Sequence, residues 1–167
     1  VVKGPYPATL LNTSGNEGYI SFDLNRDSAY FASDIGGNFD IYLNNIGVDT
    51  SISDWFNSTY ESSVKVDSVN TTYNENCPFV CKKVMVFASD RAGGMGGYDL
   101  YYSLFKNGKW TTPKNMGPSI NSNANEFRPV IETDDEYTNY LMIFSSDRTG
   151  GKGGYDLYLR GVEFDFR

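Results

Sequence analysis

Short runs of apolar residues, bounded by Gly, Asn, Asp or Pro, recur along this 167-residue chain. The run VMVFAS at 84–89 is apolar at nearly every position, which predicts a strand that is covered on both faces. The run YDLYYSLF at 98–105 alternates between polar and apolar residues and predicts another strand. No stretch places apolar residues at i, i+3, i+4 and i+7 over three helical turns. The pattern therefore predicts an all-β protein.

Two sequence markers repeat three times in the same order. One is an Asn and a Glu five positions apart, and the other is a glycine-rich segment between two aspartates. The copies are NTSGNE at 12–17, NTTYNE at 70–75 and NSNANE at 121–126, followed by SDIGGNFDIYL at 33–43, SDRAGGMGGYDLYYS at 89–103 and SDRTGGKGGYDLYLR at 146–160. Such repetition indicates a structural unit that the fold uses several times.

The second unit predicts four antiparallel strands, with a tight type I′ turn at Asn107–Gly108 before the last one. Four short strands with a buried second strand describe a blade of a β-propeller. The predicted strands are 18–22, 29–33, 39–43 and 64–66 in unit one, with an irregular stretch through Trp55; 78–80, 84–89, 98–105 and 109–112 in unit two; and 127–132, 140–146 and 155–160 in unit three.

The whole chain, 1–167, is thus predicted to be one β-propeller segment with three four-stranded blades. We place blade 1 at 12–67, blade 2 at 70–112 and blade 3 at 121–160, with segment 1–11 as a candidate to complete a blade. A closed ring of three blades would turn about 120° per blade, too sharply for sheets that pack face to face. Three arrangements stay open: a six-bladed ring of two chains, part of a longer propeller, or an open arc against a partner.

The repeat resembles the TolB-type, WD-like β-propeller repeat. The resemblance is carried by NEFRP at 125–129, FSSDRTGGKGGYDLY at 144–158, GKW at 108–110 and PKNMGPSINS at 113–122, and it extends over about 12–158. The glycine-rich form is similar to repeats of Bacteroidota envelope proteins, which often precede an OmpA-like domain. Unit one departs from it, because Ile35 replaces the arginine and the glycines are reduced to Gly36 and Gly37. The resemblance implies an exported, non-catalytic scaffold or interaction module.

This resemblance also implies a periplasmic or outer-membrane-associated location, with envelope proteins or glycan as partners. The formal charge of −7, from 14 basic and 21 acidic residues, argues against nucleic acid as a partner. An acidic surface would favour cations or a basic protein instead. No run of 18 apolar residues predicts a membrane span. The first residue is Val1 and no leader pattern follows it, so we expect a mature or trimmed form.

The chain has no histidine, which excludes Ser-His-Asp and Cys-His catalysis and any histidine-ligated metal. Pairs of carboxylates, as in glycosidases, are the remaining catalytic option. The candidates are the hairpin residues Asp134, Asp135 and Glu136, or Asp90 with Asp99. We favour a protein without catalysis. A carbohydrate-binding propeller, assisted by calcium, and a fragment of a glycosidase-like propeller are the alternatives.

The repeated charged residues allow a structural and a metal-binding interpretation. They are Asp34, Asp40, Asp90, Asp99, Asp147, Asp156, Glu17, Glu75, Glu126, Arg91 and Arg148. In the favoured structural interpretation each aspartate accepts N–H groups of its own turn, and Arg91 and Arg148 pair with a carboxylate such as Glu75 or Glu126. The glutamates would then lock blade to blade, and no cofactor is expected. In the alternative, Asp90, Asp99, Asp147 and Asp156 hold Ca²⁺.

Two cysteines and several large aromatic residues complete the candidates. In a straight strand Cys77 and Cys81 lie about 13 Å apart, beyond the roughly 4.4–6.8 Å between the Cα atoms of a disulfide. A disulfide therefore requires a bend, and buried free thiols are the other option. Trp55 and Trp110 are expected to anchor the packing between blades. The tyrosines in predicted loops, which could stack on a ligand, are Tyr6, Tyr60, Tyr73 and Tyr137.

Overall fold

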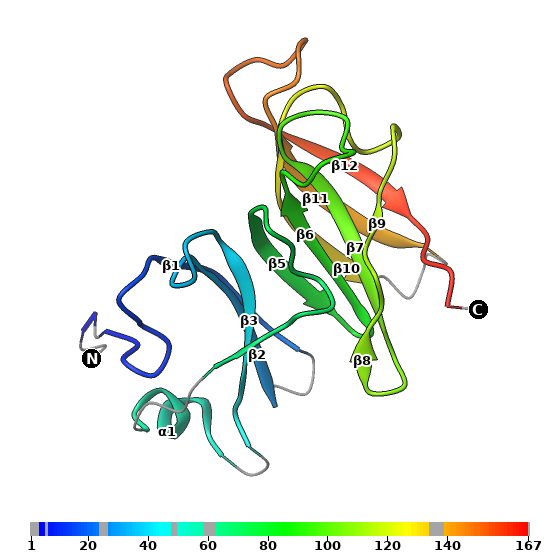
Figure 1. The fold of residues 1–167 in the computed structure, drawn as a ribbon. Helices are drawn as coiled ribbons and strands as arrows, with labels where there is room; N and C mark the ends of the chain where they lie inside the picture. The colour runs from blue at the N-terminus through cyan, green and yellow to red at the C-terminus, as the bar shows by residue number, and fades with distance from the viewer. Residues whose placement is uncertain are drawn as a thin grey trace.

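The computed structural model describes residues 4–5, 7–23, 27–47, 50–58, 63–133 and 139–166. Three antiparallel sheets follow one another along the chain and stand side by side (Figure 1). Blade 1 contains β1 (Glu17–Phe22), β2 (Ser28–Ser33), β3 (Asp40–Asn45) and β4 (Val64–Lys65); blade 2 contains β5 (Glu75–Cys81), β6 (Val84–Ser89), β7 (Asp99–Lys106), β8 (Lys109–Trp110) and β9 (Lys114–Asn115); blade 3 contains β10 (Glu126–Thr133), β11 (Tyr140–Ser146) and β12 (Asp156–Val162). The all-β prediction is confirmed.

The number of strands differs from blade to blade. Blade 1 has the predicted four, in the order β1-β2-β3-β4. In blade 2 the fourth strand predicted at 109–112 is shortened to β8, which pairs with the end of β7, and a further short strand, β9, pairs with the middle of β7. Blade 3 has the three strands β10-β11-β12 within the described part of the chain. The prediction of four strands in every blade is therefore wrong for blades 2 and 3.

The stretch around Trp55, expected to be irregular, contains the short helix α1 (Ile52–Phe56). Ser51 caps its first turn by accepting a hydrogen bond from the N–H of Asp54 at 3.0 Å. Trp55 packs with Leu10 and Leu11 over the face of blade 1 that points away from blade 2. Trp55 thus covers an end of the array and does not join two blades. Leu10 and Leu11 of segment 1–11 pack in this cluster, and the described residues of this candidate to complete a blade form no strand of the three sheets.

Two apolar layers join the three blades. Between blades 1 and 2, Tyr30 and Ile41 pack against Met85 and Phe87. Trp110 belongs to this layer and its indole N–H donates to the hydroxyl of Tyr30 at 3.3 Å, so it anchors neighbouring blades as predicted. The layer between blades 2 and 3 contains Val84, Val86, Ala88, Leu100, Met142 and Phe144. The blades are therefore held by side chains of their facing sheets.

The central strands of blades 2 and 3 differ in burial. Every residue of β6 is buried, as expected for a strand between two neighbouring sheets. In β11 buried residues alternate with exposed ones, and Leu141 and Ile143 are exposed. The prediction of a second strand covered on both faces is correct for β6 and wrong for β11, because blade 3 has a neighbour on one side only among the described residues.

Each innermost strand carries an irregularity at the same place. The register shifts between residues 18 and 21 in β1, 76 and 79 in β5, and 127 and 130 in β10. Tyr19, Cys77 and Arg128, each two positions after the repeated glutamate, have positive φ values of 59°, 53° and 53°. Despite the bend at Cys77, this cysteine and Cys81 are free and buried, which confirms the thiol alternative. Burial raises the pKa of Cys77 to about 11.

Candidate functional site

The repeated glutamates of blades 2 and 3 are fully buried and bonded within their own blade. Glu75 accepts hydrogen bonds from the N–H and the hydroxyl of Thr71, both at 2.7 Å, and from the hydroxyl of Ser89 at 2.8 Å. Arg91 pairs with the same carboxylate at 3.0 Å, and its guanidinium lies 4.7 Å from the ring centroid of Tyr101. The predicted pairing of arginine with glutamate is confirmed here.

Blade 3 repeats this arrangement, and blade 1 lacks part of it. Arg148 pairs with Glu126 at 3.0 Å. In blade 1, Ile35 stands where the arginine would be, and Glu17 accepts bonds from Ser33 at 2.9 Å and from Thr13. Glu17 is also partly exposed. The motif's departure in unit one thus removes the ion pair and the arginine's other bonds, while the glutamate keeps its bonds to the hydroxyls of Ser33 and Thr13.

The first aspartate of each repeat binds the preceding Asn, not its own turn. Asp90 accepts from the N–H of Asn74 at 2.7 Å and from its amide group at 2.8 Å. Asp34 holds Asn16 in the same way, and Asp147 holds Asn125. These bonds lower the pKa of Asp147, the backbone N–H contributing more than the side chain. The prediction that these aspartates bind their own turn is therefore wrong.

The second aspartate does bind its own loop in blades 2 and 3. Asp99 accepts from the N–H groups of Met95 and Gly96 at 2.6 and 3.1 Å, and Asp156 binds the equivalent N–H groups of its loop. In blade 1 the loop is three residues shorter. Asp40 pairs with Lys65 at 2.6 Å instead, and its second oxygen is buried without a hydrogen-bond partner.

The link between blades comes from the Asn side chain and the backbone N–H of the glutamate. Asn125 accepts from the N–H of Tyr98 at 3.0 Å, and the N–H of Glu126 donates to the carbonyl of Tyr98 at 2.7 Å. Asn74 and Glu75 bind Phe39 of blade 1 in the same way. The glutamate side chains therefore do not lock blade to blade, which corrects the sequence-based expectation.

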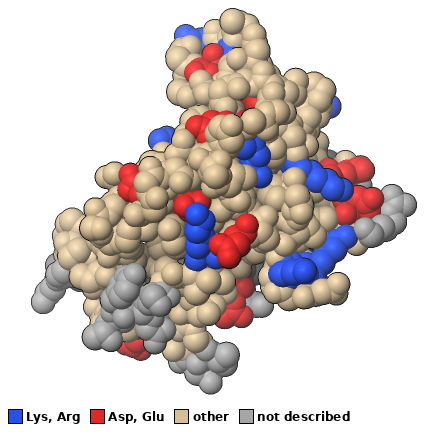
Figure 2. All heavy atoms as spheres, in the orientation of Figure 1, with Lys and Arg blue, Asp and Glu red and all other residues tan. Residues whose placement is uncertain are grey.

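Several sequence candidates lie outside the described residues: Asp134, Asp135, Glu136, Tyr6, Tyr60 and Tyr137. Tyr73 is described and is 43% exposed. Within the described part of the chain, no three side chains of His, Cys, Asp or Glu converge as metal ligands. Over the same residues no helix is long and apolar enough to cross a membrane. On the face shown in Figure 2, acidic and basic side chains are interspersed.

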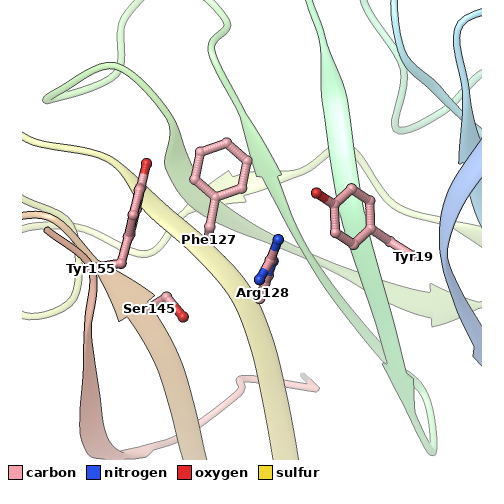
Figure 3. A pocket seen from close by; sticks show the side chains of 5 residues that line it. All are labelled: Tyr19, Phe127, Arg128, Ser145 and Tyr155. Carbon is pink, nitrogen blue, oxygen red and sulfur yellow. The ribbon is translucent and has the colours of Figure 1, made fainter. Parts of the chain in front are cut away.

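A pocket of about 280 Å³ opens beside the innermost strands, between blades 1 and 3. Tyr19 of β1 lines one side, and four residues of blade 3 line the other: Phe127, Arg128, Ser145 and Tyr155 (Figure 3). The left-handed backbone at Tyr19 and at Arg128 is part of the bulge in each strand and places both side chains in this pocket.

The pocket combines one cation with aromatic rings. The guanidinium of Arg128 lies 5.7 Å from the ring centroid of Tyr19, and hydrogen bonding to Tyr19 raises the pKa of Arg128. The rings of Phe127 and Tyr155 meet edge to face, with centroids 6.3 Å apart. Partial burial, followed by the charge of Asp147, raises the pKa of Tyr155. The described lining residues include no carboxylate, and the charge that acts most strongly on Tyr155 is that of Asp147. The site suits binding of a group that is anionic and in part apolar.

Sequence reasoning did not find this pocket. Tyr19, Arg128 and Tyr155 were not candidates, because residues 19 and 128 meet only when blades 1 and 3 are placed around β5. A signal was present in the repeat itself: the position two residues after the glutamate holds Tyr, Cys and Arg in the three units. A position that varies within a regular repeat indicates a place where the structural unit itself does not fix the side chain.

Searches of family models and of curated proteins find no match for this sequence. Solved structures do match. TolB from Acinetobacter baumannii aligns with a TM-score of 0.51 and 17% identity over 90% of this chain and 31% of its own. The endo-arabinase from Bacteroides thetaiotaomicron VPI-5482 aligns with a TM-score of 0.57 and 11% identity over 91% of this chain and 56% of its own. Both are β-propellers, so the fold is β-propeller-like, and the chain spans only part of the length of either neighbour.

Proposed function

We propose that this chain is a non-catalytic interaction module, and that the pocket of Tyr19, Arg128 and Tyr155 binds a partner protein through an acidic segment. The observation that carries the proposal is a guanidinium beside the exposed ring of Tyr19, in a pocket whose described lining includes the exposed Tyr155 and no carboxylate. Arginine binds carboxylates in bidentate fashion, and tyrosine and arginine are the side chains that most often dominate interfaces. Hydrolysis of a glycoside would instead need two carboxyl groups facing the substrate.

The proposed setting is the bacterial cell envelope, in the periplasm or at the outer membrane. Support comes from the likeness of the repeat to glycine-rich repeats of envelope proteins and from the TolB structure among the neighbours. The partner would then be another envelope protein. No cofactor is part of this proposal, since the aspartates that resemble calcium ligands already accept hydrogen bonds from the backbone.

Carbohydrate binding is the second candidate. Tyr19 and Tyr155 are 43% and 54% exposed and line the pocket, so the exposed parts of their rings can contact a sugar. The endo-arabinase among the structural neighbours makes an arabinan oligosaccharide the reasonable first probe. This alternative shares the pocket with the main proposal and differs in the chemistry of the ligand.

The test is a titration of the ¹⁵N-labelled chain with two defined probes, an acidic peptide series with one aromatic residue and an arabinan oligosaccharide. We expect the peptides to shift the amide signals of Arg128 and Tyr155. Arg128→Met should weaken this binding by about tenfold or more, since it removes a charge-assisted hydrogen bond. Arg160→Met, which changes an exposed arginine of β12 outside the pocket, is the matched control. Binding of the oligosaccharide alone would support the second candidate, and its hydrolysis would refute both.

A further inference from the structure

Blade 3 exposes an apolar sheet surface on the side away from blade 2. The surface is formed by Val130, Leu141, Ile143, Leu157 and Leu159, which we call the open face. Leu157 and Leu159 are 76% and 63% exposed. Contiguous apolar surfaces of this kind are uncommon on soluble chains and indicate a contact that is still to be made.

The open face repeats, position by position, a surface of blade 2 that is covered. Aligning Glu75 with Glu126, Ser89 with Ser146 and Asp99 with Asp156 fixes the correspondence between the first three strands of the two blades. The matched pairs are Phe79 with Val130, Val84 with Leu141, Val86 with Ile143, Leu100 with Leu157, and Tyr102 with Leu159. In blade 2, Val84, Val86 and Leu100 have no exposed surface, because Met142 and Phe144 of blade 3 pack against them. Blade 3 therefore presents the surface that receives the next blade.

The glycines of the long loops give an independent indication. A Cβ atom on Gly96 would lie 2.0 Å from the carbonyl oxygen of Ala124, and one on Gly97 would lie 2.2 Å from the side-chain oxygen of Asn125. Blade 2 thus needs glycine there because the linker of blade 3 approaches so closely. Gly154 occupies the position of Gly97 in blade 3, and a Cβ atom added to it would have no described neighbour within 4 Å. The space beside the loop of blade 3 that corresponds to the one filled by Asn125 in blade 2 therefore contains no described residue.

A third repeated feature is the backbone of the third strand, to which an Asn side chain of the next linker binds in blades 1 and 2. Asn121 accepts from the N–H of Leu100 at 2.8 Å and donates to its carbonyl at 3.0 Å. Asn70 binds Ile41 of blade 1 with the same two bonds, each 2.8 Å long. Leu157 is the equivalent residue of blade 3, and within the described ranges no side chain binds its backbone in this way. An occupant built like the linkers of blades 2 and 3 would bring an Asn to this edge.

The opposite end of the array is closed. On blade 1, helix α1 together with Leu10 and Leu11 occupies the place where a preceding blade would pack. Ala29 and Phe31 are only 0% and 2% exposed there. A second copy of this chain cannot dock by its blade 1 sheet without displacing α1. The Asn segments of blades 2 and 3 are engaged already, and the remaining one, at 12–17, precedes blade 1, whose outer sheet face is the one that α1, Leu10 and Leu11 cover. The array thus has one capped end and one open end.

We propose that the open face of blade 3 docks a further propeller blade, whose linker carries an Asn–x₃–Asn–Glu segment and whose sheet presents an apolar face. The two asparagines would bind the backbone of Leu157 and Tyr155, as Asn121 and Asn125 bind Leu100 and Tyr98. The occupant is a blade outside these 167 residues and not a second copy of the chain. The inference does not depend on the pocket or its ligand.

The first experiment supplies such a blade. A second copy of residues 107–166 is fused after Glu163, which is the position that matches Lys106. Amide hydrogen exchange is then measured at Leu157. We expect exchange at Leu157 to slow by about tenfold or more relative to the natural chain. Asn121→Ala in the appended copy should remove this protection and leave Leu100 unchanged. An extended chain whose added blade stays unfolded, or leaves Leu157 unprotected, would overturn the proposal.

The second experiment uses the natural chain and distinguishes the occupants. Light scattering should give the mass of one chain, 18.7 kDa, because a second copy lacks a free complementary face. Leu157→Arg should leave this mass and the unfolding midpoint unchanged, since the side chain is exposed. A stable dimer that Leu157→Arg converts to a monomer would assign the open face to self-association and refute the choice of a blade. In the extended chain, Gly154→Ala should lower the unfolding midpoint, because the added linker would approach its Cβ atom. In the natural chain the same substitution should leave the midpoint unchanged.

Discussion

The buried pair of Arg91 and Glu75 allows a quantitative test of the role of the repeated charges. The carboxylate of Glu75 has no exposed surface and the side chain of Arg91 is 13% exposed, with 3.0 Å between the charged groups. Removing one partner of such a pair leaves a buried charge and costs about 3–5 kcal/mol. Arg91 also donates to the carbonyl of Val69 at 2.7 Å, so its loss releases the linker that enters blade 2. We expect Arg91→Met to lower the free energy of unfolding by about 3–5 kcal/mol.

The double-mutant cycle with Glu75→Gln separates the pair from its surroundings. Glu75→Gln removes the charge but keeps most of the volume, so we expect a loss of about 3–5 kcal/mol, because it leaves the charge of Arg91 unpaired and weakens the bonds to Thr71 and Ser89. The double variant should be more stable than the sum of the two losses predicts, by about 1–3 kcal/mol. Urea unfolding followed by the fluorescence of Trp55 and Trp110 measures all four chains. Single losses below about 1 kcal/mol that simply add would show that the pair behaves as a surface salt bridge and would refute this reasoning.

Blade 1 provides the matched control. Phe31 and Tyr42 stack with ring centroids 6.0 Å apart, as Phe87 and Tyr101 do at 6.2 Å, so the surface on which the arginine lies is already present. Ile35→Arg would restore the motif beside Glu17. Because Glu17 is partly exposed, we expect a gain of no more than about 1 kcal/mol. The contrast with Arg91→Met assigns the larger effect to burial and not to the sequence motif.

Four further results are expected. Gly96→Ala should lower the unfolding midpoint strongly, because its Cβ would lie 2.0 Å from a carbonyl oxygen, whereas Gly153→Ala should change it little, and thermal denaturation measures both. Cys77 and Cys81 should react with a thiol reagent only after denaturation, when two thiols are counted; a count of zero would indicate a disulfide. Stability should fall as the pH drops through the range where Asp147 protonates, since its folded pKa lies below the unfolded value, and Asn125→Ala should weaken this dependence. A chelator should leave the unfolding midpoint unchanged if the repeat aspartates hold no calcium.

The strands could be predicted closely because their signals are local. The runs at 84–89 and 140–146 coincide with β6 and β11 to the residue, since each is bounded by residues that end a strand. The pairing of Arg91 with Glu75 also followed from the repeat, which placed both residues at fixed positions in one unit. Helix α1 was missed because five residues are too few to show a helical period, and its apolar residues resembled an irregular core segment.

The exposure of blade 3 and the pocket could not be predicted, because both depend on which blades are neighbours. The apolar runs of β6 and β11 predict the same burial, yet Leu141 is 42% exposed and Val84 is fully buried. The difference arises from the absence of a covering sheet on one side of blade 3 in the described chain. The same dependence governs Tyr19 and Arg128, whose side chains form one pocket only after β5 has placed their strands beside each other. A repeat sequence therefore determines the blade and its joints, while the number of blades determines which surfaces are left free for a partner.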